Sequence, residues 1–263
     1  MTQHLIECKN ISFSYEKLSN EKFSVENGKE VLRDVSFKTV QKEAIGIIGA
    51  NGAGKSTLLR ILVGLELNFT GEVFVDQIPV TKKFLPEIRS KIGYLFQDSD
   101  NQLFTQTVYN DVAFGPRNYG LKEPEVEKRV MTALETIGIT HLRDKQIYKM
   151  SGGEKKMASI ATILAMEPEI ILLDEPTIAL DPKNRRTLIH TLNRLDYIKI
   201  IASHDLDMIL ETCDRVILLA EGRIIREGAT ELILRDKELL EAYSLELPLC
   251  LRGYQRRTRN YYV

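Results

Sequence analysis

A glycine-rich segment that ends in Lys55, Ser56 and Thr57 carries the clearest chemistry in this chain. Residues 49–57 read GANGAGKST, which has the phosphate-binding spacing G-x-x-x-x-G-K-[ST]. The glycines allow successive backbone N–H groups to point at one anion, and a following helix adds the partial positive charge of its N-terminus. We expect Lys55 to bind the β- and γ-phosphates of a nucleotide and the Ser56 hydroxyl to bind Mg²⁺.

The residues on either side of this segment predict the structure that it requires. Ile45–Ile48 form a short apolar run typical of a buried strand, and Leu58–Leu62 show the spacing of a helix that ends near Gly64. A strand–helix turn without a ligand is the alternative interpretation, and the complete pattern in this context disfavours it.

Two adjacent carboxylates follow a second apolar run. Ile170–Leu173 predict a buried parallel strand, and Asp174 and Glu175 come at its carboxyl end, the edge where α/β sheets bind ligands. We expect Asp174 to bind Mg²⁺, through water, and Glu175 to act as the general base on the attacking water. The alternative is that the pair only caps the next helix.

A histidine and a glutamine stand at comparable positions. His204 follows the predicted strand 198–202, which we place beside the P-loop strand, so its side chain could donate to the γ-phosphate. Gln97 lies where the core gives way to a helical region, and its amide could join the Mg²⁺ shell when nucleotide is bound. A lone histidine is more often structural, and Gln97 alone would be an ordinary loop residue.

Ser151-Gly152-Gly153 predict a second helix N-terminus. Ser151 and Glu154 have the spacing of a capping box, which is the purely structural interpretation. The functional interpretation is that this N-terminus also meets a phosphate. Because the chain already has one P-loop for its own phosphate, such a site suggests a second molecule.

The rest of the pattern predicts a mixed α/β architecture. Leu5, Ile11, Phe13 and Tyr15 share one face of a strand, and residues 31–40 and 70–76 add two more strands of a small antiparallel sheet. Residues 98–165 are expected to form a helical insertion, interrupted at Gly115-Pro116 and Glu123-Pro124. The remaining signals are a turn at Asn27-Gly28, a helix with Val126, Val130, Leu134 and Ile137 on one face, a helix capped by Asp181-Pro182, a strand at 216–219 and a hairpin turn at Glu221-Gly222.

Composition limits the possible functions. The 263 residues carry a formal net charge of −1, which disfavours a nucleic-acid partner, and no apolar stretch is long enough to span a membrane. Three scattered cysteines and an N-terminus without a signal-peptide core favour a reducing cytoplasm. Any membrane role should therefore depend on a partner. The final residues, RGYQRRTRNYYV, suit either a binding segment or a solvated tail.

Over residues 5 to about 230, the motifs and their order resemble those of the ATP-binding-cassette (ABC) ATPases. They are Tyr15 in an adenine-stacking loop, GANGAGKST at 49–57 (Walker A), Gln97 (Q-loop), MSGGEKK at 150–156 (signature), IILLDEP at 170–176 (Walker B), Asp181 in the D-loop and His204 in the H-loop. Two residues depart from the family pattern, since Glu154 replaces the commoner glutamine and Met150 the commoner leucine.

The resemblance implies a P-loop NTPase core (1–97 and 166–235) with an N-terminal antiparallel subdomain, the helical insertion 98–165 and a C-terminal extension 236–263. It also implies that two cassettes, identical or paralogous, close head to tail around two ATP–Mg²⁺. Each ATP site would use residues of one chain together with Ser151, Gly152 and Gly153 of the other, while Asp181 couples the two sites. The residues expected from the first chain are Tyr15, Gly49, Asn51, Gly52, Ala53, Gly54, Lys55, Ser56, Thr57, Gln97, Asp174, Glu175 and His204.

Residues 93–120 resemble more narrowly the cobalt/nickel and energy-coupling-factor importers. The resemblance implies a transmembrane partner docking near Asp98–Phe104, with Leu103 and Phe104 as exposed anchors, and an indirect substrate-binding membrane subunit. The protein would then lie peripherally on the cytoplasmic face of the cell membrane. Packing of both anchors into the helical insertion is the alternative. A vitamin importer of the same type remains open; a soluble ABC protein or an exporter is less consistent with the motifs.

Overall fold

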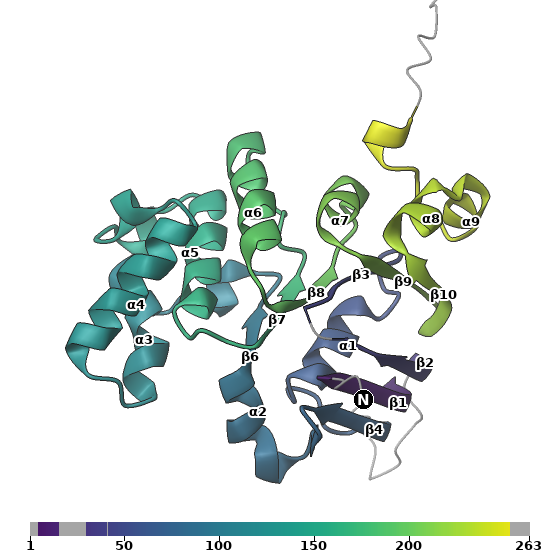
Figure 1. Ribbon diagram of the computed structural model, residues 1–263, viewed down its shortest axis with the longest axis horizontal. Coiled ribbons are helices and arrows are strands. Elements are labelled where there is room, and N and C mark those ends of the chain that lie inside the picture. The colour runs from purple at the N-terminus through teal and green to yellow at the C-terminus, as the bar shows by residue number, and fades with distance from the viewer. Residues whose placement is uncertain (1–4, 16–29, 41, 253–263) are drawn as a thin grey trace, which may run out of the picture.

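The computed structural model of this chain describes residues 5–15, 30–40 and 42–252, which form two β-sheets and several helices (Figure 1). The turn at Asn27-Gly28 and the tail beyond Arg252 lie outside these residues. The strands are β1 (Ile6–Ser14), β2 (Glu30–Lys38), β3 (Ala44–Ile48), β4 (Thr70–Val75), β5 (Ile78–Pro79), β6 (Ile92–Leu95), β7 (Ile170–Asp174), β8 (Ile198–Ala202), β9 (Arg215–Ala220) and β10 (Arg223–Ala229).

The helices are α1 (Lys55–Leu62), α2 (Leu85–Lys91), α3 (Val108–Asn118), α4 (Glu123–Thr136), α5 (Gly152–Leu164), α6 (Pro182–Arg194), α7 (Leu206–Thr212), α8 (Thr230–Arg235) and α9 (Lys237–Ala242). Short 3₁₀ turns are η1 (Lys82–Phe84), η2 (Ser99–Asn101), η3 (Thr140–Leu142), η4 (Ile147–Lys149) and η5 (Leu249–Leu251). None of these helices is both long and apolar enough to cross a bilayer.

The larger sheet has the strand order β10-β9-β3-β8-β7-β6. Its five strands from β9 to β6 are parallel, and β10 pairs antiparallel with β9 through the expected turn at Glu221-Gly222, where both residues have positive φ. Strands β3, β7 and β8 are buried at every residue. The apolar runs 45–48 and 170–173 predicted this for β3 and β7. Strand β8 also buries Lys199, whose ammonium donates to the carbonyls of Leu192 and Leu195. The predicted pairing of strand 198–202 with the P-loop strand is confirmed.

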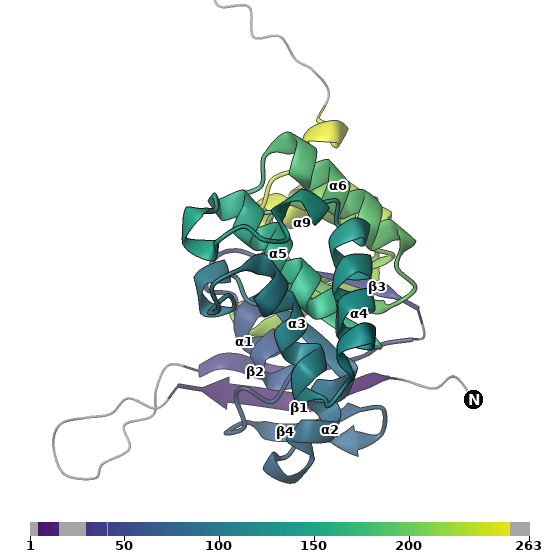
Figure 2. The same cartoon turned by 90° about the vertical axis from the view of Figure 1, so that its left-hand side faces the viewer.

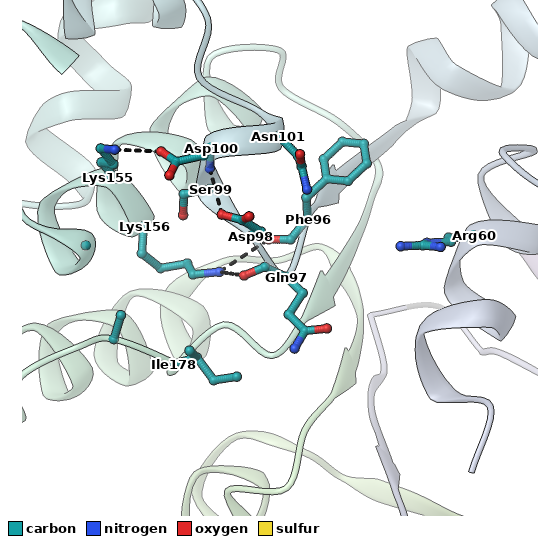
Figure 3. Close-up of a pocket in the computed structure, with 12 residues that line it drawn as sticks. Arg60, Phe96, Gln97, Asp98, Ser99, Asp100, Asn101, Lys155, Lys156 and Ile178 are labelled. Carbon is teal, nitrogen blue, oxygen red and sulfur yellow. Dashed lines mark hydrogen bonds and ion pairs between the residues drawn. The ribbon is translucent and has the colours of Figure 1, made fainter. Parts of the chain in front are cut away.

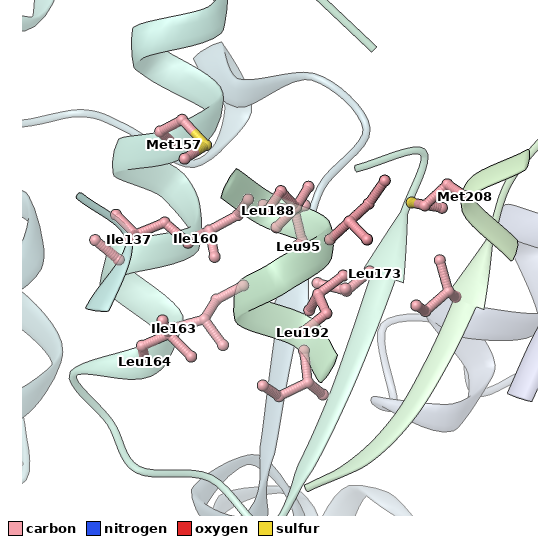
Figure 4. Packing of buried hydrophobic residues seen from close by; sticks show 14 of the residues in the cluster. Leu95, Ile137, Met157, Ile160, Ile163, Leu164, Leu173, Leu188, Leu192 and Met208 are labelled. Carbon is pink, nitrogen blue, oxygen red and sulfur yellow. The ribbon is translucent and has the colours of Figure 1, made fainter. Parts of the chain in front are cut away.

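The two faces of this sheet support separate apolar clusters. Ile170 and Leu172 of β7 point into a cluster that includes α1 and the smaller sheet. Ile171 and Leu173 point the other way, into a cluster with helices α3 to α7, part of which is shown in Figure 4. Because side chains alternate along a strand, one short run of apolar residues joins both halves of the core.

The smaller sheet has the order β2-β1-β4-β5 and is antiparallel, as predicted. The prediction of one buried face along all of β1 is wrong. Ile6 and Cys8 are buried on one parity, whereas Ile11 and Phe13 are buried on the other. Asn10 lies between them with a φ of 51°, where the register with both neighbouring strands shifts. An extra residue at such a bulge moves every later side chain to the opposite face.

Helices α3, α4 and α5 pack together beside the larger sheet, above the smaller one in Figure 2. The helix with Val126, Val130 and Leu134 on one face is confirmed as α4. The break expected at Gly115-Pro116 is wrong, because α3 continues through both residues to Asn118. At Gly115 a Cβ would lie 2.3 Å from Met166 Sδ, so close packing accounts for this glycine.

Candidate ATP site at the carboxyl edge of the parallel sheet

Four parallel strands deliver the predicted residues to one edge of the sheet. The P-loop follows β3, His204 follows β8, Asp174 and Glu175 end β7, and Gln97 follows β6. Carboxyl ends of parallel strands meet at a common edge, so residues far apart in the sequence become neighbours. A cleft of about 510 Å³ opens there, lined by Tyr15, Val31, Asn51, Gly52, Ala53, Gly54, Lys55, Ser56, Thr57, Gln97 and Glu175.

The P-loop curls tightly between β3 and α1. Gly49 has a φ of 154°, and a Cβ there would lie 2.1 Å from the carbonyl oxygen of Leu219, so any larger residue would collide with β9. Lys55 begins α1 and is 7% exposed; its ammonium donates to the carbonyls of Gly49 (2.7 Å) and Ala50 (3.2 Å). Burial lowers the pKa of Lys55, against the opposing effect of the nearby carboxylates. A phosphate entering the loop would replace the carbonyls as the partner of this cation.

Ser56 and Asp174 place two side-chain oxygens next to each other. The Ser56 hydroxyl donates to Asp174 Oδ1 over 2.9 Å, and Asp174 is 1% exposed. Burial raises the pKa of Asp174, although the bond from Ser56 opposes that rise. A desolvated carboxylate beside a hydroxyl, with the exposed amide of Gln97 at the same edge, is a hard-oxygen donor set that fits Mg²⁺.

Glu175 faces the end of β8. Its Oε2 accepts from the Ser203 hydroxyl (3.2 Å) and from the backbone N–H of His204 (3.3 Å), and it lies 2.8 Å from His204 Nδ1. The Glu175 side chain is 7% exposed, whereas that of His204 is 57% exposed. The sequence analysis did not assign a role to Ser203. Its position directly after a predicted buried strand and before His204 could have indicated that it lies at this site.

Tyr15 approaches the same cleft from the smaller sheet. It is 42% exposed, its ring packs edge-on against Phe13 at 4.8 Å, and its hydroxyl lies 3.2 Å from Thr57 Oγ1. The tyrosine of the expected adenine-stacking loop therefore lies against the P-loop helix. Its stacking on adenine stays a prediction.

Ser151 begins α5 through the expected capping box, which is confirmed. Its hydroxyl oxygen accepts from Glu154 N (3.3 Å), and its own N–H donates to Glu154 Oε2 (2.9 Å). Ser151 and Gly152 are exposed and do not line the cleft of the P-loop. The structure therefore does not bring this helix N-terminus to the phosphate site of the same chain.

The D-loop packs against the signature. A Cβ on Gly153 would lie 3.0 Å from the carbonyl of Ala179, a residue with a φ of 67°. Asp181, which follows two residues later, caps α6 by accepting from Asn184 N over 2.8 Å, as predicted. Its coupling of the two sites stays a prediction.

Lys156 ties the signature helix to the Q-loop and was missed by the sequence analysis. This residue of α5 is 2% exposed, and its ammonium donates to the carbonyls of Gln97 (2.6 Å) and Phe96 (3.3 Å), as Figure 3 shows. Burial lowers its pKa, and the nearby carboxylates oppose that effect. A lysine in a helical sequence gives no sign of burial, so nothing in the sequence distinguished Lys156 from the partly exposed Lys155 before it.

The expected docking segment has one exposed anchor rather than two. Leu103 is 6% exposed and belongs to the helical core, so its predicted exposure is wrong. The preceding Gln102 fixes the chain there, because its amide donates to Ser159 O and Thr162 Oγ1, each over 2.8 Å. Phe104 is 65% exposed and packs edge-on against Phe114, with ring centroids 4.7 Å apart.

A parallel sheet with a P-loop, a buried aspartate hydrogen-bonded to a serine and a second carboxylate at one edge defines a P-loop nucleoside triphosphatase. The family profile described as "ABC transporter" matches residues 32–178. The chain belongs to this family, the ATP-hydrolysing subunits of ABC transporters.

Relatives and solved structures agree with this assignment. The "Energy-coupling factor transporter ATP-binding protein EcfA" of Methanothermobacter thermautotrophicus is 42% identical over 249 residues, covering 93% of this chain and 77% of the relative. The structure of cbiO1 from Clostridium perfringens, described as part of the ABC transporter complex cbiONQ, is 35% identical with a TM-score of 0.76, covering 91% of this chain and 94% of that one.

A third comparison concerns nucleotide binding. The dimeric post-hydrolysis structure of the ATP-binding cassette MJ0796, bound to ADP and Pi, is 28% identical with a TM-score of 0.76. It covers 86% of this chain and 98% of the MJ0796 chain.

Proposed function

We propose that this chain is the ATPase subunit of an energy-coupling-factor type importer that takes up cobalt or nickel ions. The name of the EcfA relative and the membership of cbiO1 in a cbiONQ complex support this transporter type. The FQ-D-x-x-x-QLF and DVAFGP sequences within residues 93–120 support it independently. Vitamin uptake by the same kind of transporter is the alternative, since the ATPase does not itself contact the substrate.

The exposure of the signature at the start of α5 is the observation that carries the mechanism. Ser151 and Gly152 are exposed, outside the cleft formed by their own P-loop. In the capping box Ser151 uses its hydroxyl oxygen as an acceptor, so the hydroxyl hydrogen is free to donate outward. We infer that Ser151, Gly152 and Gly153 bind the ATP of a second cassette, identical or paralogous, in a head-to-tail dimer.

Each remaining site residue has a role in this proposal. Lys55 and the P-loop bind the phosphates, Tyr15 stacks on adenine, and His204 contacts the γ-phosphate. Glu175 is the general base, which requires its carboxylate to leave His204 and face the attacking water when the dimer closes. Closure is a population shift, because ATP contacts both subunits only in the closed state. Asp181 couples the two sites.

Mg²⁺ would bind to Ser56, Gln97 and Asp174, directly or through water. The ion would supply positive charge that stabilises the transferring γ-phosphoryl group. Ser56 and Asp174 already lie within a hydrogen bond of each other, so the oxygen ligands would need little rearrangement. Gln97 follows β6 and stands next to the helical region, a position suited to sensing nucleotide.

The transmembrane partner would dock near Asp98–Phe104, with Phe104 and Phe114 as the apolar contact. Two exposed aromatic rings packed against each other form a surface suited to a partner helix. We propose the core at 1–97 and 166–235, the insertion at 98–165 and the extension at 236–263. The protein would lie on the cytoplasmic face of the cell membrane, without a nucleic-acid partner.

The dimer proposal is tested by measuring ATPase rate per chain against protein concentration. We expect the rate to rise with concentration and reach a plateau, because each site needs residues of two chains. A constant rate in a protein shown to be monomeric would contradict the proposal. Affinity isolation from membranes, with identification of every co-purifying subunit, tests the transporter type and separates metal uptake from vitamin uptake.

A further inference from the structure

Glu154 places a carboxylate at the third position of the signature helix. A negative charge there favours the helix itself, because it complements the positive end of the helix dipole. The same charge opposes the proposed docking of ATP phosphates at this N-terminus, since like charges repel most strongly where water is excluded. The helix therefore needs a neighbouring cation that neutralises the Glu154 carboxylate while leaving its hydrogen bond to the cap in place.

Lys145 is that cation in this chain. Its ammonium lies 2.8 Å and 2.9 Å from the two carboxylate oxygens of Glu154. This contact is the largest cause of the lowered pKa of Glu154, ahead of the bond from the Ser151 backbone. The two side chains are 34% and 27% exposed, so water screens the pair only in part.

The backbone holds Lys145 in place on both sides. Its N–H donates to Leu142 O over 2.9 Å, and its carbonyl accepts from Val108 N over 3.1 Å. The lysine therefore stands on a fixed segment in front of α5 and reaches the cap without rearrangement.

The two lysines that follow Glu154 in the sequence bind other partners. Lys155 pairs with Asp100 over 2.6 Å, and Lys156 donates to the carbonyls of the Q-loop (Figure 3). Their charges are directed away from the cap. Lys145 is the cation that the described structure sets directly on Glu154.

We propose that Lys145 is a positioning residue of the signature: it neutralises Glu154, so that a carboxylate can cap α5 without repelling the ATP held by the second cassette. This inference rests on the proposed head-to-tail dimer. The variation it explains is the replacement of glutamine by glutamate in the signature. A glutamine could make the same cap without a charge and would need no such partner.

The test is a double-mutant cycle with Lys145→Met, Glu154→Gln and the double variant, read out as the protein concentration that gives half-maximal ATPase rate. In the chain that keeps Glu154, we expect Lys145→Met to raise this concentration fivefold to tenfold. When the chain also carries Glu154→Gln, the same lysine substitution should change it less than twofold. Lys145→Arg keeps the charge, so it should leave this concentration close to that of the unmodified protein.

Lys128→Met is the matched control, since it removes one charge from an exposed position of a different helix, α4. ATP binding at low protein concentration and the thermal midpoint detect loss of the fold. If Lys145→Met had the same effect with and without Glu154→Gln, the inference about Lys145 would be overturned, while the proposed head-to-tail dimer would still stand. A concentration-independent rate in the unmodified protein would instead overturn the proposed function.

Discussion

Replacement of Lys156 by methionine tests how the Q-loop is held. Methionine keeps most of the apolar stem, and it removes the ammonium that binds the carbonyls of Gln97 and Phe96. Hydrogen bonds from a charged donor contribute about 1.5–3 kcal/mol each. Removing a desolvated charge, whose burial lowers its pKa, offsets part of that loss. We expect a net decrease of about 2 kcal/mol in the free energy of unfolding.

Lys155→Met is the matched comparison, one residue earlier on the same helix. Lys155 pairs with Asp100, whose side chain is 66% exposed, so its loss should cost less than about 1 kcal/mol. Urea unfolding of both variants, followed by circular dichroism, gives the two values. Hydrogen exchange of the segment 96–102 should increase in the Lys156 variant only.

Equal unfolding free energies for the two variants would refute this reasoning, because the buried ammonium would then contribute no more than a surface ion pair. A Lys156 variant more stable than the unmodified protein would refute it as well. In that case the cost of burying the charge exceeds the value of both hydrogen bonds.

Other predictions follow from the site and the core. Glu175→Gln should lower kcat about 10²- to 10⁴-fold while the ATP-bound dimer persists, as size-exclusion chromatography can show; near-normal turnover would remove Glu175 as the base. Gly49→Ala should abolish ATP binding and lower the free energy of unfolding by at least about 2 kcal/mol. For Gly52→Ala, where an added Cβ has no atom within 4 Å, the decrease should be about 1 kcal/mol. A thiol reagent should modify one cysteine per native chain, the exposed Cys250, and reach the buried Cys8 and Cys213 only in denaturant. Burial raises the pKa of Cys213 to about 12, so early labelling there would indicate local opening.

Local signals in the sequence predicted much of the fold. Strands β3 and β7 could be found because short apolar runs between turn residues have few alternatives. The start of α6 followed from Asp181-Pro182, and the capping box of α5 from the spacing of Ser151 and Glu154. Each of these signals depends on residues within a few positions of one another.

The errors arose where distant contacts decide the outcome. The face of β1 changes at Asn10 because of register shifts against its partner strands, which no alternation pattern records. Helix α3 passes through Gly115-Pro116, and Leu103 turns inward because Gln102 binds α5. In each case tertiary packing overrides the local preference of the chain.

The sequence by itself determined the chemistry: a P-loop, two carboxylates, a histidine and a capped signature helix follow from residue types at short spacing. Only the tertiary structure decided which of these residues meet. Parallel pairing brings β3, β8, β7 and β6 side by side, so their carboxyl ends form one site, and it leaves Ser151 outside that site. The same packing buries Lys156 and pairs Lys145 with Glu154. The partner of a charged side chain depends on which segments pack beside it, and residue order alone does not give that.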